Sequence, residues 1–214
     1  MERIICLAIG YLFGMFQTSY IIGKIHHMDI RQYGSGNAGT TNALRTLGKK
    51  AGAMTLIGDM LKCVIAILIV DAVFENRYQE ILPLLGMYTA AGCVLGHNFP
   101  FYLHFKGGKG IAVSAAVIVV SNLHPVFIGV GLAVFILVVA VTRYVSLGSL
   151  IVVWYIPIFT LLYYRESDLF PVILIVSLLF TILAYIKHKA NIIRLIHGTE
   201  NKFGEKKEKK SEEN

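Results

Sequence analysis

Glycine, hydroxyl and basic side chains gather in one polar segment, residues 31–50, which reads RQYGSGNAGTTNALRTLGKK. A loop of small residues that enters a helix at about Thr41 leaves several backbone N–H groups unpaired, and such a nest binds phosphate. Arg45 follows about one helical turn later and can offer a charged fork to the same anion. The alternative is a flexible, well-capped loop without a ligand. The predicted phosphate-binding residues of this segment, besides Arg45, are Gly34, Ser35, Gly36, Asn37, Gly39, Thr40 and Thr41.

The same glycines match a dinucleotide-binding pattern. Gly34, Gly36 and Gly39 fit G-x-G-x-x-G, and an acidic residue, Asp59, stands twenty residues after Gly39. That pattern requires a strand before the glycines and a free acidic side chain after them. Here an apolar run of helical length precedes the glycines and Asp59 lies inside another apolar run, so we reject a dinucleotide site.

A second segment, residues 96–110, reads GHNFPFYLHFKGGKG and also combines glycine with lysine. It lacks the spacing and the Ser or Thr of a Walker A loop. Anchoring at a membrane surface would account for the lysines but not for the glycines around them. His97 is compatible with either a buried, hydrogen-bonded role or a reactive one. His97 and His104 have no third metal ligand at a suitable spacing, so no metal site is predicted. The predicted phosphate-binding residues here are Lys106, Gly107, Gly108, Lys109 and Gly110.

Two further polar segments follow. The short loop TRYVSLGS, residues 142–149, contains Ser146 and is uninformative alone. The segment KHKANIIRLIHGTENKF, residues 187–203, places His188 and Asn191 on one helical face by three-residue spacing, and Gly198 is expected to end that helix. A basic amphipathic helix lying on anionic lipid is the alternative, but it leaves Asn191 and Glu200 without a role.

Asp59 and Lys62 are one helical turn apart inside an apolar run. Charged residues inside a membrane segment are costly and face the bundle interior or a water-filled cavity. We interpret the pair first as a structural clamp. Positioning of the 34–39 loop is the alternative.

Composition identifies the elements that must position these residues. Of the 214 residues 15% are charged and 56% hydrophobic, which excludes an ordinary water-soluble globule. The formal net charge of +7 lies mostly in short segments between apolar runs and in the end of the chain, so anionic lipid explains it better than nucleic acid. The three cysteines form no pair motif and are expected to be small buried hydrophobes: Cys6, Cys63 and Cys93.

The apolar runs predict a bundle of transmembrane helices. A run of about twenty residues crosses a hydrocarbon core of roughly 30 Å. Residues 111–142 contain no Asp, Glu, Lys or Arg and have His124-Pro125 near the middle, so we expect a hairpin of two short helices there. The other predicted spans are residues 4–23, 51–72, 81–103, 145–164 and 169–186.

Basic residues set the predicted orientation. About seven spans place residues 24–50, 104–110, 143–144 and 187–214 on one face, which carries 16 of the 20 Lys and Arg residues. The positive-inside rule makes this face cytoplasmic and the N-terminus external. We therefore predict an all-α integral membrane protein, with a transmembrane domain at 1–201 and a charged cytoplasmic tail at 202–214.

Together the polar segments predict a phosphate-handling site at the cytoplasmic membrane surface. No reactive thiol, serine triad or metal cluster is present to form a covalent intermediate, so the substrate must bring its own activation. A transporter for an organic phosphate is an alternative, although the expected inverted repeats are not visible. A non-enzymatic membrane scaffold is another alternative, and it would leave the glycine loops without a function.

Three blocks of this sequence resemble the PlsY family of bacterial membrane acyl-phosphate:glycerol-3-phosphate acyltransferases. The blocks are GSGNAGTTNALR, GHNFPFYLHFKGGKG and HKANIIRLIHGTEN, in that order, and the resemblance covers residues 1–204. It implies a seven-helix bundle that transfers a fatty acyl group from acyl phosphate to the primary hydroxyl of glycerol 3-phosphate. The implied products are lysophosphatidate and phosphate, and acyl-CoA is not the implied donor. We predict no cofactor, no metal and no nucleic-acid partner.

The resemblance also implies roles for individual residues. Ser35 to Asn37 and Arg45 would bind phosphate groups, and Lys106 with its adjoining glycines would bind glycerol 3-phosphate. His188 and Asn191 would orient the substrate hydroxyl or the reacting phosphate, with Ser146 as a further polar contact and Glu200 joining the tail to the core. The implied catalytic set is Ser35, Arg45, His188 and Asn191. Cys63 and His197 depart from the residues expected in relatives, without loss of a proposed ligand.

Overall fold

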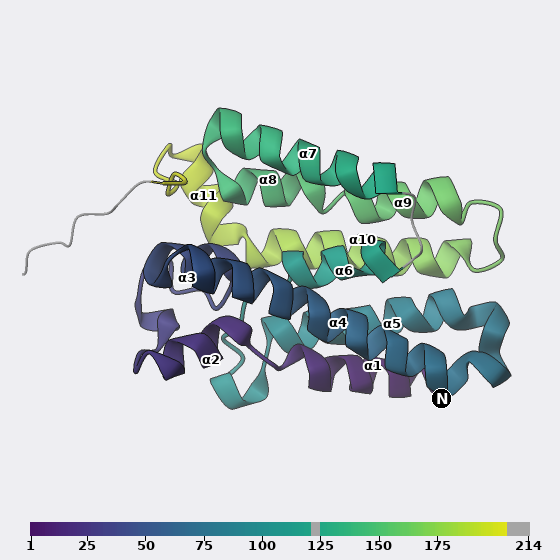
Figure 1. Cartoon of the computed structure of the whole chain (residues 1–214). Helices are drawn as coiled ribbons and strands as arrows, with labels where there is room; N and C mark the ends of the chain where they lie inside the picture. The colour runs from purple at the N-terminus through teal and green to yellow at the C-terminus, as the bar shows by residue number, and fades with distance from the viewer. Residues whose placement is uncertain (121–124, 205–214) are drawn as a thin grey trace, which may run out of the picture.

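The protein is all-helical in a computed structural model that describes residues 1–120 and 125–204, with no strand among them (Figure 1). The predicted all-α fold is therefore confirmed. The predicted turn at His124 and most of the predicted tail lie outside the described residues. The helices are α1 (Glu2–Gly14), α2 (Thr18–Ile25), η1 (Ile30–Gln32), α3 (Thr40–Leu47), α4 (Lys49–Tyr78), η2 (Gln79–Ile81), α5 (Leu82–Asn98), η3 (Phe101–Leu103), α6 (Ile111–Val120), α7 (Pro125–Thr142), α8 (Val145–Val152), α9 (Tyr155–Tyr163), α10 (Phe170–Lys187) and α11 (Lys189–Ile196).

Most of the helical segments are apolar enough to lie in a bilayer. Four segments of the described chain are long and apolar enough to cross a membrane: Glu2–Ile25, Lys49–Leu103, Val145–Tyr163 and Phe170–Lys187. The second of these contains both α4 and α5. Val126–Thr142 is a shorter apolar helix. With ten residues, α6 is about 15 Å long, which agrees with the short helix expected for the first half of 111–142. With 18 residues, α7 is longer than the second short helix expected there.

The long helices run side by side, with α7, α8 and α9 on one side of the bundle and α1, α4 and α5 on the other (Figure 1). Between them lie α6 and α10. The short helices α2, α3 and α11 gather at one end, at the left of Figure 1. We call this the site end; it contains residues 26–48, 99–110, 143–144 and 188–204.

Two predicted helices are interrupted. The single helix expected over 4–23 divides into α1 and α2. At the break, side chains donate hydrogen bonds to backbone carbonyl oxygens in place of helical N–H groups. Lys62 Nζ of α4 donates to Phe16 O at 2.6 Å, and Gln17 Nε2 donates to Gly14 O at 3.4 Å. The helix expected over 145–164 divides into α8 and α9. Pro157 explains this second break, because proline has no N–H for the carbonyl of residue 153 and its ring clashes with that carbonyl.

The backbones of α1 and α5 pack directly against each other. Glycines occur four residues apart on both helices, at Gly10 and Gly14 and at Gly92 and Gly96, and a Cβ at any of them would overlap backbone of the partner helix. Small residues at this spacing let membrane helices approach closely. The cysteines are buried and unpaired, as predicted, with Cys63 and Cys93 in the main hydrophobic core.

Candidate active site

A cavity of about 520 Å³ joins a polar wall at the site end to an apolar interior. Residues far apart in sequence form the polar wall: Ser35, Asn37, Thr40, Thr41, Asn42, Arg45, Asp59, His97, Lys109, Ser146, Ser149, His188, Asn191, Glu200 and Asn201. The apolar wall includes Leu56, Met60, Ile111, Ala115, Ile118, Ile128, Leu132, Phe135, Val152 and Tyr155. The cavity therefore suits a ligand with an anionic head and a long apolar chain.

The first glycine loop is organised by a side chain that the sequence patterns did not single out. Asn42 is 1% exposed; its Oδ1 accepts from the Ser35 N–H at 2.8 Å, and its Nδ2 donates to Ile30 O and Tyr33 O, both at 3.0 Å. Gly34 has φ +61°, a left-handed conformation that favours glycine. The loop is thus folded back on α3. The sequence feature that could have identified Asn42 as a site residue is its position three residues before Arg45, on the same helical face.

The start of α3 offers unpaired donors to the cavity. Gly39 begins the helix without a side-chain cap, and Thr40 Oγ1 is buried with no hydrogen-bond partner. Within the described part of the chain, Arg45 has no hydrogen-bond or ion-pair partner either. A helix N-terminus and a free guanidinium that line one cavity are groups that can bind an anion, as the sequence predicts.

Also on the cavity wall, Glu200 joins the C-terminal segment to α8 and α11. Its Oε1 accepts from Asn191 Nδ2 at 2.8 Å and from Ser146 Oγ at 3.2 Å, and its Oε2 pairs with Arg194 Nε at 2.8 Å. Asn191 Oδ1 in turn accepts from Lys109 Nζ. This network brings four predicted site residues together, and its geometry suits a structural role for Glu200.

Lys109 is the cation whose charge is most affected by its surroundings. Burial, helped by the charges of Arg194, Lys187 and Arg45, lowers the pKa of the Lys109 ammonium to about 8, while Glu200 opposes the shift. The side chain is therefore mostly protonated at neutral pH and loses its charge as the pH rises through 8. Glu200 already pairs with Arg194, so a bound phosphate would supply a further counter-charge for Lys109.

His188 is fixed in one tautomer. Its Nδ1 lies 2.8 Å from the Ala184 carbonyl oxygen, which can only accept, so Nδ1 carries the proton and Nε2 is left as an acceptor. Burial, with a smaller effect of the Lys109 charge, lowers the pKa of the imidazole to about 4. At neutral pH His188 is therefore uncharged and can accept a hydrogen bond from a substrate hydroxyl.

Some predicted residues lie outside the cavity wall. Gly34, Gly36, Lys106, Gly107 and Gly108 do not line it, and Lys106 is exposed. A Cβ on Gly107 would overlap the His97 carbonyl oxygen, which gives this glycine a packing role. Ligand binding by these five residues stays a prediction. Asp59 and His97, for which no ligand role was predicted, do line the cavity.

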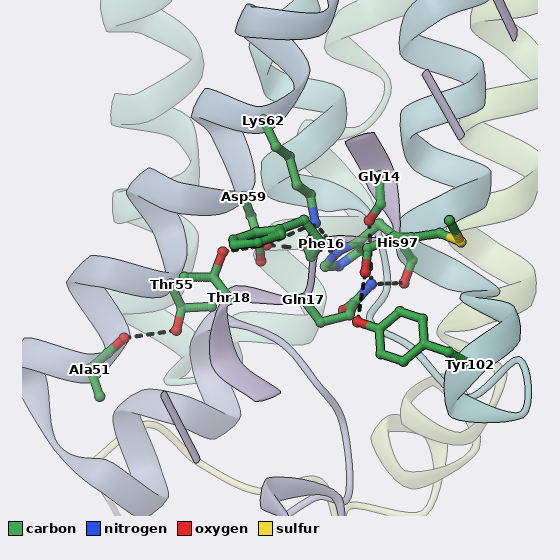
Figure 2. Close-up of polar contacts among 11 residues, drawn as sticks. Gly14, Phe16, Gln17, Thr18, Ala51, Thr55, Asp59, Lys62, His97 and Tyr102 are labelled. Atoms are coloured by element: carbon green, nitrogen blue, oxygen red, sulfur yellow. Dashed lines mark hydrogen bonds and ion pairs between the residues drawn. The ribbon is translucent and has the colours of Figure 1, made fainter. Parts of the chain in front are cut away.

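Asp59 and Lys62 form a buried ion pair, with Oδ1 and Nζ 3.0 Å apart (Figure 2). Thr18 Oγ1 donates to Asp59 Oδ1 at 3.3 Å, and Lys62 also bonds to the break between α1 and α2. The pair thus ties α4 to α2 and to the break before it, which suits the clamp interpretation. Within the described residues, no hydrogen bond or ion pair joins Asp59 or Lys62 to the 34–39 loop.

Comparison with known proteins gives one consistent family. Residues 4–198 match the sequence profile of the family described as glycerol-3-phosphate acyltransferase. A glycerol-3-phosphate acyltransferase of Clostridioides difficile (strain 630) is 50% identical over 207 residues, covering 96% of this chain and 97% of its own. Another, of Thermoanaerobacter sp. (strain X514), is 39% identical over 209 residues, covering 97% and 99%.

Solved structures show the same architecture. A crystal structure of PlsY, an integral membrane glycerol 3-phosphate acyltransferase, in its glycerol 3-phosphate form superposes with a TM-score of 0.81 at 30% identity, over 95% of this chain and 96% of the other. The lysophosphatidic acid form of PlsY gives a TM-score of 0.77 over the same shares.

Proposed function

The chain belongs to the glycerol-3-phosphate acyltransferase family and is an integral membrane acyltransferase, and we propose that its acyl donor is acyl phosphate. The acyl group passes to the 1-hydroxyl of glycerol 3-phosphate, which gives lysophosphatidate and inorganic phosphate. This is the first acylation of phospholipid synthesis. The enzyme lies in the cytoplasmic membrane of a bacterium, surrounded by lipid, with the site end toward the cytoplasm.

The observation that carries this proposal is the division of one cavity into a cationic and an apolar part. Arg45, Lys109 and the start of α3 can neutralise two phosphate groups that would otherwise repel each other. The apolar interior can take the fatty chain of the donor. Both substrates thereby meet in one cavity, whose wall includes His188.

The reaction needs no acyl-enzyme. The glycerol hydroxyl oxygen attacks the carbonyl carbon of the mixed anhydride, the carbon–oxygen bond to phosphate breaks, and phosphate leaves with the electron pair. The hydroxyl proton passes to a phosphate oxygen of the donor. The three cysteines do not line the cavity, and the leaving group is already a stable anion, so positioning and charge neutralisation suffice.

His188→Ala tests where that proton goes. We expect kcat to fall by roughly tenfold, well short of the 10²–10⁴-fold that a general base contributes, because Nε2 only orients the hydroxyl. His197→Ala is the matched control: its Nδ1 also bonds a backbone carbonyl, at 2.7 Å, but the ring is exposed and away from the cavity. Complete loss of turnover in His188→Ala with substrate binding intact would assign the base to His188.

The donor is tested with purified protein in detergent and glycerol 3-phosphate, supplied with acyl phosphate, acyl-CoA or acyl carrier protein in separate reactions. We expect lysophosphatidate and phosphate in equal amounts from acyl phosphate alone. A protein-free reaction corrects for spontaneous hydrolysis of the anhydride. Equal or faster turnover of acyl-CoA would refute the proposed donor while leaving the acyltransferase family unaffected.

A further inference from the structure

The C-terminal end of α5 is capped by the glycine loop that precedes Lys109. The carbonyl groups at a helix C-terminus lack partners within the helix. His97 O accepts from the Gly108 N–H at 3.0 Å and from Gln17 Nε2 at 2.9 Å, and Asn98 O accepts from the Gly107 N–H at 3.3 Å. The loop is therefore held directly on the end of α5.

The His97 ring is fixed from one side by Lys62 (Figure 2). Lys62 Nζ lies 2.8 Å from His97 Nδ1, and an ammonium group only donates, so Nδ1 accepts and Nε2 carries the proton. The three N–H groups of Lys62 have three acceptors, the others being Phe16 O at 2.6 Å and Asp59 Oδ1 at 3.0 Å. With Lys62 and His97 respectively 5% and 3% exposed, little solvent is present to compete.

The other edge of the ring contacts the loop. A Cβ on Gly108 would overlap His97 Nε2, so only glycine lets the backbone pass this close to the ring. Lys109 follows immediately, and its Nζ donates to Asn191, which also lines the cavity. The position of the His97 ring therefore limits where the Lys109 backbone can lie.

We propose that Lys62 and His97 are positioning residues for the transferase reaction: Lys62 orients the His97 ring, and His97 holds Gly107 and Gly108 so that the Lys109 ammonium reaches the phosphate of glycerol 3-phosphate. This positioning role explains why Asp59 and Lys62 form a buried ion pair at a site where two apolar side chains would cost less free energy to bury. It rests on the proposed phosphate-binding role of Lys109.

His97→Leu is the first variant, because Lys62 keeps two acceptors and no unpaired charge is created. We expect KM for glycerol 3-phosphate to rise about tenfold with kcat nearly unchanged, since misplacing a binding group affects binding more than chemistry. The neutral double variant Asp59→Asn/Lys62→Met, which removes the pair together, should give the same change. Thr55→Val is the matched control, because Thr55 lies in α4 with Asp59 and Lys62, and its hydroxyl donates to Ala51 O in that helix, at 2.8 Å.

A double-mutant cycle separates positioning from general loss of stability. If His97 acts through Lys109, His97→Leu should have little further effect on KM in a Lys109→Met background. Additive effects, or a wild-type KM in His97→Leu, would overturn the inference. Absence of lysophosphatidate from the wild-type protein in the same assay would instead refute the proposed function.

Discussion

Arg45→Ala is expected to lower kcat/KM by at least about 100-fold, the cost of removing one preorganised donor to developing charge. Arg45 lies in the last turn of α3, lines the cavity and has no hydrogen-bond or ion-pair partner in the described part of the chain. Its removal should therefore leave the fold intact but leave a phosphate group without a counter-charge. Turnover with acyl phosphate and thermal unfolding in detergent measure the two effects.

Arg165→Ala is the control for loss of a positive charge. Arg165 is 75% exposed, and among the described residues its ion pair is with its neighbour Glu166, so activity should be unchanged. Activity near the wild-type level in Arg45→Ala would exclude the phosphate site at α3 from the mechanism.

Lys109→Met should raise KM for glycerol 3-phosphate by roughly 100-fold, because a buried cation on the phosphate-binding wall is lost. The pH profile gives an independent signature. Since kcat/KM reports the groups of the free enzyme, and the pKa of Lys109 in the free enzyme is lowered to about 8, wild-type kcat/KM should fall as the pH rises through 8. The remaining activity of Lys109→Met should lack this alkaline limb.

Lys50→Met is the matched control, because Lys50 is exposed at the start of α4 and outside the cavity wall. It should keep both the wild-type KM and the alkaline limb. An alkaline limb that persists unchanged in Lys109→Met would show that another group titrates there.

Much of the candidate site could be predicted because a chain that crosses the membrane several times must return repeatedly to the same face of the membrane. The apolar runs force the polar segments to the ends of the helices, so Arg45, Lys109, His188 and Asn191 could be expected at the same end. The structure places all four on the wall of one cavity. Residue type and helical spacing were sufficient to select them.

The residues that escaped prediction act through tertiary contacts. Asn42 reads as an ordinary helical residue until its side chain is seen to hold three backbone groups of the preceding loop. The break between α1 and α2 depends on Lys62, 46 residues from the Phe16 carbonyl that it contacts. No local pattern encodes contacts at that separation.

The glycines of the second loop illustrate a different limit. Glycine followed by lysine predicts phosphate binding, which stays a prediction for Gly107 and Gly108, and the structure adds that both glycines approach His97 closely. A glycine required by a ligand and a glycine required by packing look the same in sequence. The position of His97 reveals the packing requirement.

Accessibility from the two sides of the membrane tests most directly whether these segments form one site at one face. Single cysteines are placed at Gln32, Lys106 and Glu166, all exposed, in a protein whose native cysteines are replaced by alanine. In right-side-out vesicles an impermeant maleimide should label only the cysteine at 166, and lysis should expose the other two together. Labelling of positions 32 and 106 from opposite sides would contradict the account.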